Sequence, residues 1–346
     1  MEYRKLGRTD LEISAIGLGT MTWGFQNTQA DGFEQMDYAL EHGINFFDTA
    51  EMYAIPPSGE TFGTTETIIG NWFASRQKRD KVILATKITG PGLPWIREGN
   101  NEINKKNIHL AIEGSLKRLQ TDYIVLYQLH WPNRGSYHFG QIWDYTPKFD
   151  VQEQEDNFFE VLQTIQALIQ AGKIRHFGLS NETAWGLMKW LQIARQHNLP
   201  RIASIQNEYS LLCRHFEPDL SEIATHEDCG LLAWSPLCRG MLSGKYLNGA
   251  RPEGARLTIE TRLEHRILPV TDAAIRKYVE LAKRHELDTC QMALSFVTNK
   301  PFVSSTLIGA TNMTQLKSNI DAISLTLPIE LNEEIEKIRR EYPMPF

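Results

Sequence analysis

The sequence predicts an α/β fold in which eight βα units close into a single (β/α)8 TIM barrel, and three observations lead to it. Short apolar runs alternate with longer amphipathic segments along the chain, which is typical of βαβ units with a parallel sheet. Eight such runs are present, the number that closes the barrel. The stretch Gly17-Leu18-Gly19-Thr20-Met21-Thr22-Trp23 lacks the third glycine of the pattern that follows the first strand of a doubly wound dinucleotide-binding sheet. The barrel is therefore favoured over the open sheet.

The strands are expected at the short apolar runs, and the helices at the segments that place apolar residues at i, i+3, i+4 and i+7. The expected strands are Ala15–Leu18, Ile44–Phe47, Val82–Thr86, Tyr123–Leu129, Ile174–Leu179, Ala203–Ile205, Leu231–Trp234 and Val303–Ile308. The expected helices are Gly32–Glu41, Glu66–Ser75, Lys105–Leu119, Asp156–Gln170, Ala184–His197, Pro218–Thr225, Asp272–His285 and Met313–Ile323.

Further segments are expected to extend the barrel at both ends. Residues 3–6 and 11–14 flank a turn and predict an N-terminal β-hairpin that caps the barrel, and residues 289–298 predict an extra short helix. Two long βα loops, Asn133–Glu155 and Ser235–Val270, have the length of functional loops. A chain of 346 residues would also accommodate two domains, but the strand pattern predicts one domain over residues 1–346.

Composition excludes several classes of function. The 36 basic and 42 acidic residues give a net charge of −6 with no concentrated basic face, so neither nucleic acid nor an anionic membrane is an expected partner. No signal peptide or transmembrane stretch is expected. The four cysteines form no C-x-x-C pair and no zinc spacing, so we expect free thiols, no metal and a reducing, cytoplasmic location.

Polar residues follow three consecutive apolar runs. Asp48 comes after the second run, Lys87 after the third and His130 after the fourth, and Tyr53 lies in the same loop as Asp48. Because chemistry in a (β/α)8 barrel gathers at the C-terminal ends of the strands, these four side chains are expected to converge. Each alone would also be explained as a solvated loop residue, but together they indicate a catalytic cluster.

The predicted cluster is suited to giving a proton to a carbonyl oxygen. A tyrosine hydroxyl has a pKa of about 10, and a nearby lysine ammonium lowers this pKa by favouring the phenolate. A carboxylate keeps the lysine charged, and a histidine orients the carbonyl and shares in proton transfer. Reduction also needs a hydride, which no side chain supplies and a cofactor such as a nicotinamide does. The spacing by itself does not select that cofactor.

The motifs around these residues resemble those of the aldo-keto reductase superfamily. Gly43-Ile44-Asn45-Phe46-Phe47-Asp48-Thr49-Ala50-Glu51-Met52-Tyr53 is similar to its signature loop, and Ala85-Thr86-Lys87 and Gln128-Leu129-His130-Trp131-Pro132 match its next two motifs. The resemblance covers essentially the whole chain and is strongest to the branch of bacterial Tas-like proteins that includes potassium-channel β-subunits. It implies a catalytic tetrad of Asp48, Tyr53, Lys87 and His130.

The resemblance also implies a binding site for NADP(H). The residues expected around the nicotinamide are Thr20, Met21, Asp48, Ser180, Asn181, Gln206 and Trp234. Those expected at the phosphates are Ser235, Pro236, Leu237, Cys238, Arg239, Gly240, Leu242, Ser243, Lys245 and Arg256. Those expected at the adenosine end are Gly309, Thr311, Gln315 and Asn319. Cationic side chains, glycines and a helix N-terminus suit such an anion physically.

One departure concerns the adenosine end, where a better-known branch has a Lys-Ser…Arg pattern and this chain has Gln315 and Lys317. Preference for NADPH over NADH is therefore a weaker expectation than the tetrad. The aromatic candidates for a hydrophobic substrate pocket are Trp23, Trp95, Trp131, Tyr137, Phe139, Trp143 and Tyr145. The pocket role is favoured for Trp131, which follows His130, whereas Trp143 and Tyr145 are expected to pack against the barrel. The substrate and the oligomeric state are left open.

Three functions are compatible with these observations. The first is an enzyme that reduces aldehydes or ketones with NADPH, with Tyr53 as general acid. The second is an NADP(H)-binding regulatory module like the channel β-subunits, which lack a histidine at the position of His130. The third is an aldolase with Lys87 as Schiff base, which requires an uncharged lysine and is disfavoured by the predicted proximity of Asp48. The presence of His130 favours the reductase.

Overall fold

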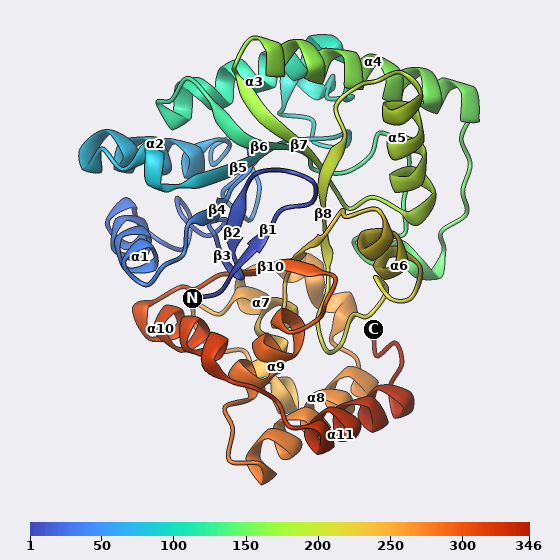
Figure 1. The fold of residues 1–346 in the computed structure, drawn as a ribbon. Coiled ribbons are helices and arrows are strands. Elements are labelled where there is room, and N and C mark those ends of the chain that lie inside the picture. The colour runs from blue at the N-terminus through green and yellow to red at the C-terminus, as the bar shows by residue number, and fades with distance from the viewer.

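The computed structural model describes residues 1–260 and 264–346 and has eight parallel strands that close into a barrel surrounded by helices (Figure 1). The strands follow one another around the barrel in chain order, and β10 closes it against β3. The barrel strands are β3 (Ile16–Gly19), β4 (Phe46–Asp48), β5 (Ile83–Ile88), β6 (Ile124–Leu129), β7 (Ile174–Ser180), β8 (Ile202–Glu208), β9 (Leu231–Trp234) and β10 (Val303–Ile308). The predicted fold class is thereby confirmed.

The helices surround the barrel as an outer layer. They are α1 (Gln29–Glu41), α2 (Thr64–Arg76), α3 (Lys105–Leu119), α4 (Val151–Gln170), α5 (Ala184–Gln196), α6 (Asp219–His226), α7 (Arg256–Ile259), α8 (Pro269–Arg284), α9 (Thr289–Thr298), α10 (Met313–Asp321) and α11 (Ile329–Glu341). Several begin at a side chain that accepts a hydrogen bond from the first turn, such as Asn104 before α3 and Asp150 before α4. These caps fix where each helix starts after its loop.

The N-terminal hairpin fills one end of the barrel. Strands β1 (Tyr3–Lys5) and β2 (Glu12–Ser14) pair antiparallel, as the sequence predicts. Leu6 and Ile13 are fully buried there against a barrel-interior cluster that includes Phe46 and Leu126. The C-terminal ends of the strands lie at the opposite, open end of the barrel. The polar residues that follow those strands therefore line the mouth of the barrel at that end.

Two differences from the predicted elements have a physical cause. Helix α4 begins at Val151, five residues before the expected start at Asp156, because the Asp150 carboxylate caps it there. Helix α11 was not predicted at all; it buries Leu331, Ile335 and Ile338, which repeat at helical spacing. The extra helix α9 is where the sequence places it, whereas the two long loops end earlier than expected, where α4 begins at Val151 and α8 at Pro269.

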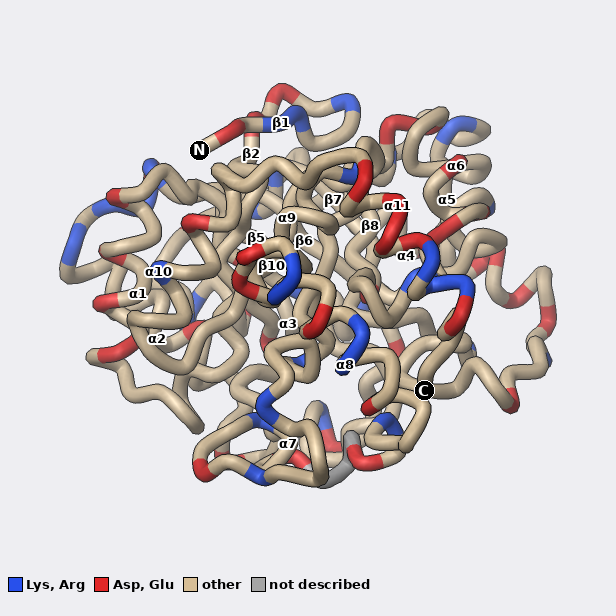
Figure 2. Tube along the Cα trace, turned by 90° about the horizontal axis from the view of Figure 1, so that it is seen from below, with Lys and Arg blue, Asp and Glu red and all other residues tan. Residues whose placement is uncertain are grey.

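Charged residues of both signs are interspersed along the chain in the view of Figure 2. Among the described residues, no helix combines the length and the apolar character that crossing a bilayer requires. The same residues contain no group of three or more histidine, cysteine and carboxylate side chains arranged to hold a metal ion.

Candidate active site

A buried ion pair joins the ends of β4 and β5. Nζ of Lys87 lies 2.7 Å from Oδ2 of Asp48 and 2.8 Å from the carbonyl oxygen of Thr49, and the lysine side chain is completely buried. Burial lowers the pKa of Lys87, but the Asp48 carboxylate and the Tyr53 hydroxyl raise it more, so the pKa lies above its ordinary value. The lysine is therefore a fixed cation, as the sequence predicts.

Two amides hold the other oxygen of Asp48. Nε2 of Gln206 donates to Oδ1 over 2.8 Å, and Nε2 of Gln128 donates to the same atom over 3.2 Å. Gln206 was expected at a nicotinamide, and here it also fixes a member of the tetrad. Gln128 was not predicted as a site residue, although it lies in β6 only two residues before His130.

Tyr53 lies beside this pair. Nζ of Lys87 is 5.1 Å from the centre of the Tyr53 ring, and the rings of Tyr53 and His130 meet edge to face with centroids 5.7 Å apart. Burial raises the pKa of Tyr53, Lys87 lowers it and Asp48 raises it, with the net pKa above the ordinary value. The expected lowering by Lys87 is present, but the expectation of a lowered pKa was wrong because burial is the larger effect.

His130 is a buried, neutral imidazole. Burial, with a smaller effect of the Lys87 charge, holds the pKa of His130 well below its ordinary value. Its Nδ1 atom is buried and has no hydrogen-bond partner among the described residues. The centre of the Trp131 ring lies 4.9 Å from the centre of the His130 ring. A neutral histidine retains a free ring nitrogen for a ligand atom.

A chain of hydrogen bonds connects β7, β8 and β9 next to His130. The Asn181 amide donates to the carbonyl oxygen of His130 over 2.8 Å and to Oγ of Ser180 over 3.1 Å. Ser180 in turn donates to the carbonyl of Gln206, and the Trp234 indole donates to Oδ1 of Asn181 over 3.2 Å. Four of the residues expected around a nicotinamide thus meet at one place, next to the tetrad.

On the opposite side, Thr20 donates to the carbonyl of Asp48 over 2.9 Å, and Met21 lies against Arg256, with Sδ 3.2 Å from Nη1. Burial and the nearby Arg239 charge lower the pKa of Arg256 to about 10. Nη1 of Arg239 and Nε of Arg256 are buried and lack hydrogen-bond partners within residues 1–260 and 264–346. Two partly buried cations close to one another, each with a buried, unused donor atom, suit a multiply charged anion.

The loop after β9 folds tightly beside these cations. Ser235, Arg239 and Gly240 have positive φ angles of 59°, 59° and 88°. The guanidinium of Arg239 lies 5.8 Å from the Trp234 ring centre, and a Cβ at position 240 would come within 3.3 Å of Nζ of Lys245. Glycine thus leaves room for the lysine. Of the other residues expected here, Cys238 and Leu242 point into the core.

The last expected subsite is the N-terminus of α10. The Asn312 side chain caps the helix, because its Oδ1 accepts a hydrogen bond from the backbone N–H of Gln315 over 2.9 Å. Oε1 of Gln315 accepts from the backbone and side chain of Thr311 over 3.0 and 3.2 Å, and Asn319 donates to the carbonyl of Gly309 over 3.3 Å. The four expected residues are therefore neighbours around α10, whose first turn has free N–H groups that favour anions.

The structure separates the expected aromatic residues. Trp23 is fully buried and donates to Gln35, so it belongs to the core and not to a pocket. Trp131 lies beside His130 as expected. Trp143 is 66% exposed, and its indole reaches the carbonyl of Phe346 over 3.3 Å; the expectation that it packs against the barrel was wrong.

The fold and this cluster at the C-terminal ends of the strands define a (β/α)8-barrel enzyme. The chain belongs to the aldo/keto reductase family, whose model matches residues 15–340, and it is therefore an oxidoreductase. The resemblance drawn from the motifs is confirmed.

Individual relatives cover nearly the whole chain. Protein tas of Escherichia coli (strain K12) is 47% identical over 352 residues, which span 100% of this chain and 99% of that protein. The uncharacterized oxidoreductase YrpG of Bacillus subtilis (strain 168) is 33% identical over 96% of this chain and 94% of its own length. A probable voltage-gated potassium channel subunit beta of Arabidopsis thaliana is 28% identical over 99% of this chain and 98% of that protein.

Proposed function

We propose that this protein reduces aldehydes or ketones to alcohols with NADPH, and that Tyr53 is the general acid. The observation that carries the proposal is the position of Lys87, whose ammonium is fixed by Asp48 over 2.7 Å and lies beside the Tyr53 ring. A cation held next to a phenol stabilises the phenolate that remains after proton transfer. The raised pKa of Tyr53 keeps the proton on the phenol until a carbonyl oxygen gains negative charge.

His130 has a separate role in this proposal. Because its pKa is well below the ordinary value, the imidazole is neutral near pH 7 and does not compete with Tyr53 as a charged acid. Its ring packs against that of Tyr53, so a carbonyl oxygen that reaches the phenol also reaches the imidazole. We assign to His130 the orientation of the carbonyl through a hydrogen bond.

The residues present fit a nicotinamide dinucleotide phosphate. Ser180, Asn181 and Gln206 would hold the carboxamide, and Trp234 would stack on the ring. Arg239, Lys245 and Arg256 would neutralise the phosphates; two of these have unused buried donors. Thr311, Gln315 and Asn319 would hold the adenosine end at the start of α10. When bound, the cofactor supplies the hydride.

The remaining properties follow from this proposal. Residues 1–346 act as one barrel domain, the partner is a small carbonyl compound and not nucleic acid, and the protein works in the cytoplasm. A second candidate is an NADP(H)-binding regulatory module, favoured by the likeness to a relative described as a probable potassium channel β-subunit. His130 at its place beside Tyr53 supports the enzyme.

The test is the variant Tyr53→Phe, which keeps the ring but removes the proton. We expect it to lower kcat for a good aldehyde substrate by about 10²- to 10⁴-fold. The loss of NADPH absorbance measures this rate. Binding of NADPH, titrated by its fluorescence, should remain close to that of the unmodified protein. Wild-type turnover by Tyr53→Phe would contradict the mechanism, and NADPH binding with no reduction of any carbonyl by the unmodified protein would favour the regulatory module.

A further inference from the structure

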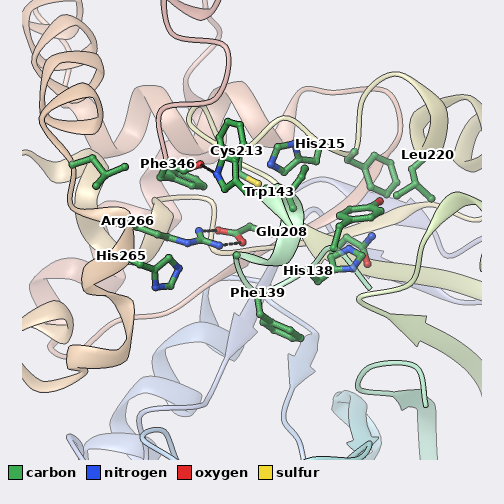
Figure 3. Close-up of a pocket in the computed structure, with 16 residues that line it drawn as sticks. His138, Phe139, Trp143, Glu208, Cys213, His215, Leu220, His265, Arg266 and Phe346 are labelled. Atoms are coloured by element: carbon green, nitrogen blue, oxygen red, sulfur yellow. Dashed lines mark hydrogen bonds and ion pairs between the residues drawn. The ribbon is translucent and has the colours of Figure 1, made fainter. Parts of the chain in front are cut away.

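A cavity of about 300 Å³ opens at the C-terminal mouth, on the side of β8 (Figure 3). Its wall is formed by the β6–α4 loop, the β8–α6 loop, the segment before α8 and the C-terminal residue. Aromatic side chains from these separate segments dominate the wall: Tyr137, Phe139, Trp143, Phe216 and Phe346. None of the tetrad residues lines it. A cavity of this size with aromatic walls is typical of a small-molecule site.

One side chain belongs both to this cavity and to the surroundings of the candidate active site. The Phe139 ring stacks on Trp234 with centroids 6.2 Å apart and meets the Trp131 ring edge to face at 6.1 Å. Trp131 in turn contacts His130. The Phe139 ring in the cavity wall is thus connected to His130 through one intervening ring, Trp131. A molecule bound at Tyr53 must therefore extend past Trp131 to enter the cavity.

Two charged groups in the wall, Glu208 and Arg266, neutralise each other. Glu208 and Arg266 form a buried ion pair, with Nη2 of the arginine 2.9 Å from Oε2 of the carboxylate, and the Arg266 guanidinium also lies 4.4 Å from the Phe346 ring centre. Burial lowers the pKa of His138 to about 3 and also lowers the pKa of His215, so neither histidine adds a charge near pH 7. Neither Glu208 nor Arg266 is therefore left as an unpaired countercharge for a charged ligand.

We propose that this cavity binds an uncharged ring system that forms the remote part of the carbonyl substrate, and that the protein prefers carbonyl compounds with two or more rings. This inference rests on the proposed function, because it names the substrate class of the same site. One ring next to the carbonyl ends near Trp131, whereas a second ring reaches Phe139 and the cavity. Burial of that second ring is favourable, since it removes apolar surface from water.

The kinetic test compares benzaldehyde, 2-naphthaldehyde and a carboxylated 2-naphthaldehyde. We expect kcat/KM to be at least about tenfold higher for 2-naphthaldehyde than for benzaldehyde, and the carboxylate to remove that advantage. Ile142→Trp places a larger side chain on the cavity wall, because Ile142 lines the cavity. This variant should lose the preference for 2-naphthaldehyde and retain kcat/KM for benzaldehyde.

The matched control is Gln141→Trp, because Gln141 is the exposed neighbour of Ile142 and does not line the cavity. The Gln141→Trp protein should retain the preference for 2-naphthaldehyde over benzaldehyde. Leu220→Trp fills the cavity from helix α6, so it tests the opposite wall if Ile142→Trp disturbs the loop. Equal loss for both aldehydes in Ile142→Trp and Leu220→Trp, or no loss in either, would overturn the inference.

A binding measurement separates this inference from the proposed function. 2-Naphthol has the two rings but no carbonyl, and calorimetry should show that it binds the unmodified protein and Gln141→Trp but not Ile142→Trp. This result would support the ring site even if no aldehyde were reduced, which would contradict the proposed function alone. Reduction of both aldehydes with equal kcat/KM and no binding of 2-naphthol would contradict the ring site alone.

Discussion

The amide of Gln206 donates a 2.8 Å hydrogen bond to Oδ1 of Asp48, so a residue at the end of β8 fixes a carboxylate at the end of β4, across the barrel. The other oxygen of that carboxylate holds Lys87. The position of the lysine therefore depends on both sides of the barrel, and not on the neighbouring strands β4 and β5 alone. Gln206 also lies among the residues proposed to hold the nicotinamide.

Replacement of this amide should affect stability and cofactor binding together. Gln206→Met removes a hydrogen bond to a buried carboxylate, which should lower the free energy of unfolding by about 1.5–3 kcal/mol. It also removes a proposed carboxamide contact, so Kd for NADPH should rise. Urea denaturation and titration of NADPH fluorescence measure the two effects separately.

Gln128→Met is the matched control for Gln206→Met, because Gln128 donates to the same oxygen over 3.2 Å but has no proposed cofactor contact. It should lower the free energy of unfolding to a smaller extent and leave Kd for NADPH unchanged. An equal rise of Kd in both variants would mean that Gln206 acts only through Asp48.

The Asp48–Lys87 pair should respond unequally to the loss of either partner. Asp48→Asn removes the carboxylate partner of the buried Lys87 ammonium and leaves the Thr49 carbonyl at 2.8 Å, which should cost about 3–5 kcal/mol of unfolding free energy. Lys87→Met should cost less, because Asp48 keeps two amide donors. In the double variant the cost should be smaller than the sum of the two. Additive costs in urea denaturation would show that the two groups do not interact.

A second buried ion pair joins the loop that carries His130 to the loop after β7. Arg134, after β6, forms a bidentate pair with Glu182, after β7, and both side chains are almost fully buried. The guanidinium also lies over the rings of Phe149, Phe158 and Trp185. Asn181, which holds the carbonyl of His130, directly precedes Glu182. The pair therefore positions residues on both sides of the proposed nicotinamide site.

Gly186→Ala should break this pair without changing either of its members. A Cβ at position 186 would overlap both the Glu182 carboxylate and the Arg134 guanidinium. Because the separation leaves buried charges unpaired, we expect the free energy of unfolding to fall by about 3–5 kcal/mol, together with a rise of Kd for NADPH. Thermal and urea denaturation measure the first effect.

Gly135→Ala is the control, because Gly135 directly follows Arg134, a Cβ there would meet no atom within 4 Å, and the residue is not at a positive φ. It should leave stability unchanged or raise it by up to about 1 kcal/mol, because alanine restricts the unfolded chain. A Gly186→Ala protein as stable as Gly135→Ala would show that the ion pair yields to the methyl group at little cost.

The sequence predicted those features that repeat locally. Eight apolar runs predicted the barrel, because strands buried on both faces are continuously apolar. The polar residues after these runs predicted which side chains line the mouth of the barrel. Asp48, Lys87 and His130 could be placed together because consecutive strands are neighbours in a barrel. Helix α11 was missed although it has helical spacing, because the eight βα units already accounted for the barrel.

Features that depend on contacts between distant segments could not be predicted. The pairs Arg134–Glu182 and Glu208–Arg266 join residues that lie far apart in the sequence, and a charged residue is expected to be exposed until its partner is known. The direction of the pKa shift of Tyr53 is a competition between burial and Lys87. Only the arrangement in space decides which of the two effects is larger.

His138 should make the protein sensitive to acid. It lies in the β6–α4 loop, Nδ1 is 3.0 Å from Oγ of Ser136, and burial lowers its pKa to about 3. The unfolded chain takes up a proton below about pH 6.5, whereas the folded protein does not until about pH 3. The contribution to stability is therefore complete above pH 6.5 and decreases as the pH falls toward 3.

At about pH 5 this residue alone should cost about 2 kcal/mol relative to neutral pH, since each unit between the two pKa values corresponds to about 1.4 kcal/mol. His130, whose pKa is also lowered, adds to the same trend. His138→Asn keeps a polar group near Ser136 but cannot take up a proton. Urea denaturation of both proteins at about pH 7.5 and about pH 5 should show a smaller decrease for His138→Asn, by about 2 kcal/mol. If the two proteins lost stability in parallel, the buried imidazole at position 138 would not be the source of the acid sensitivity.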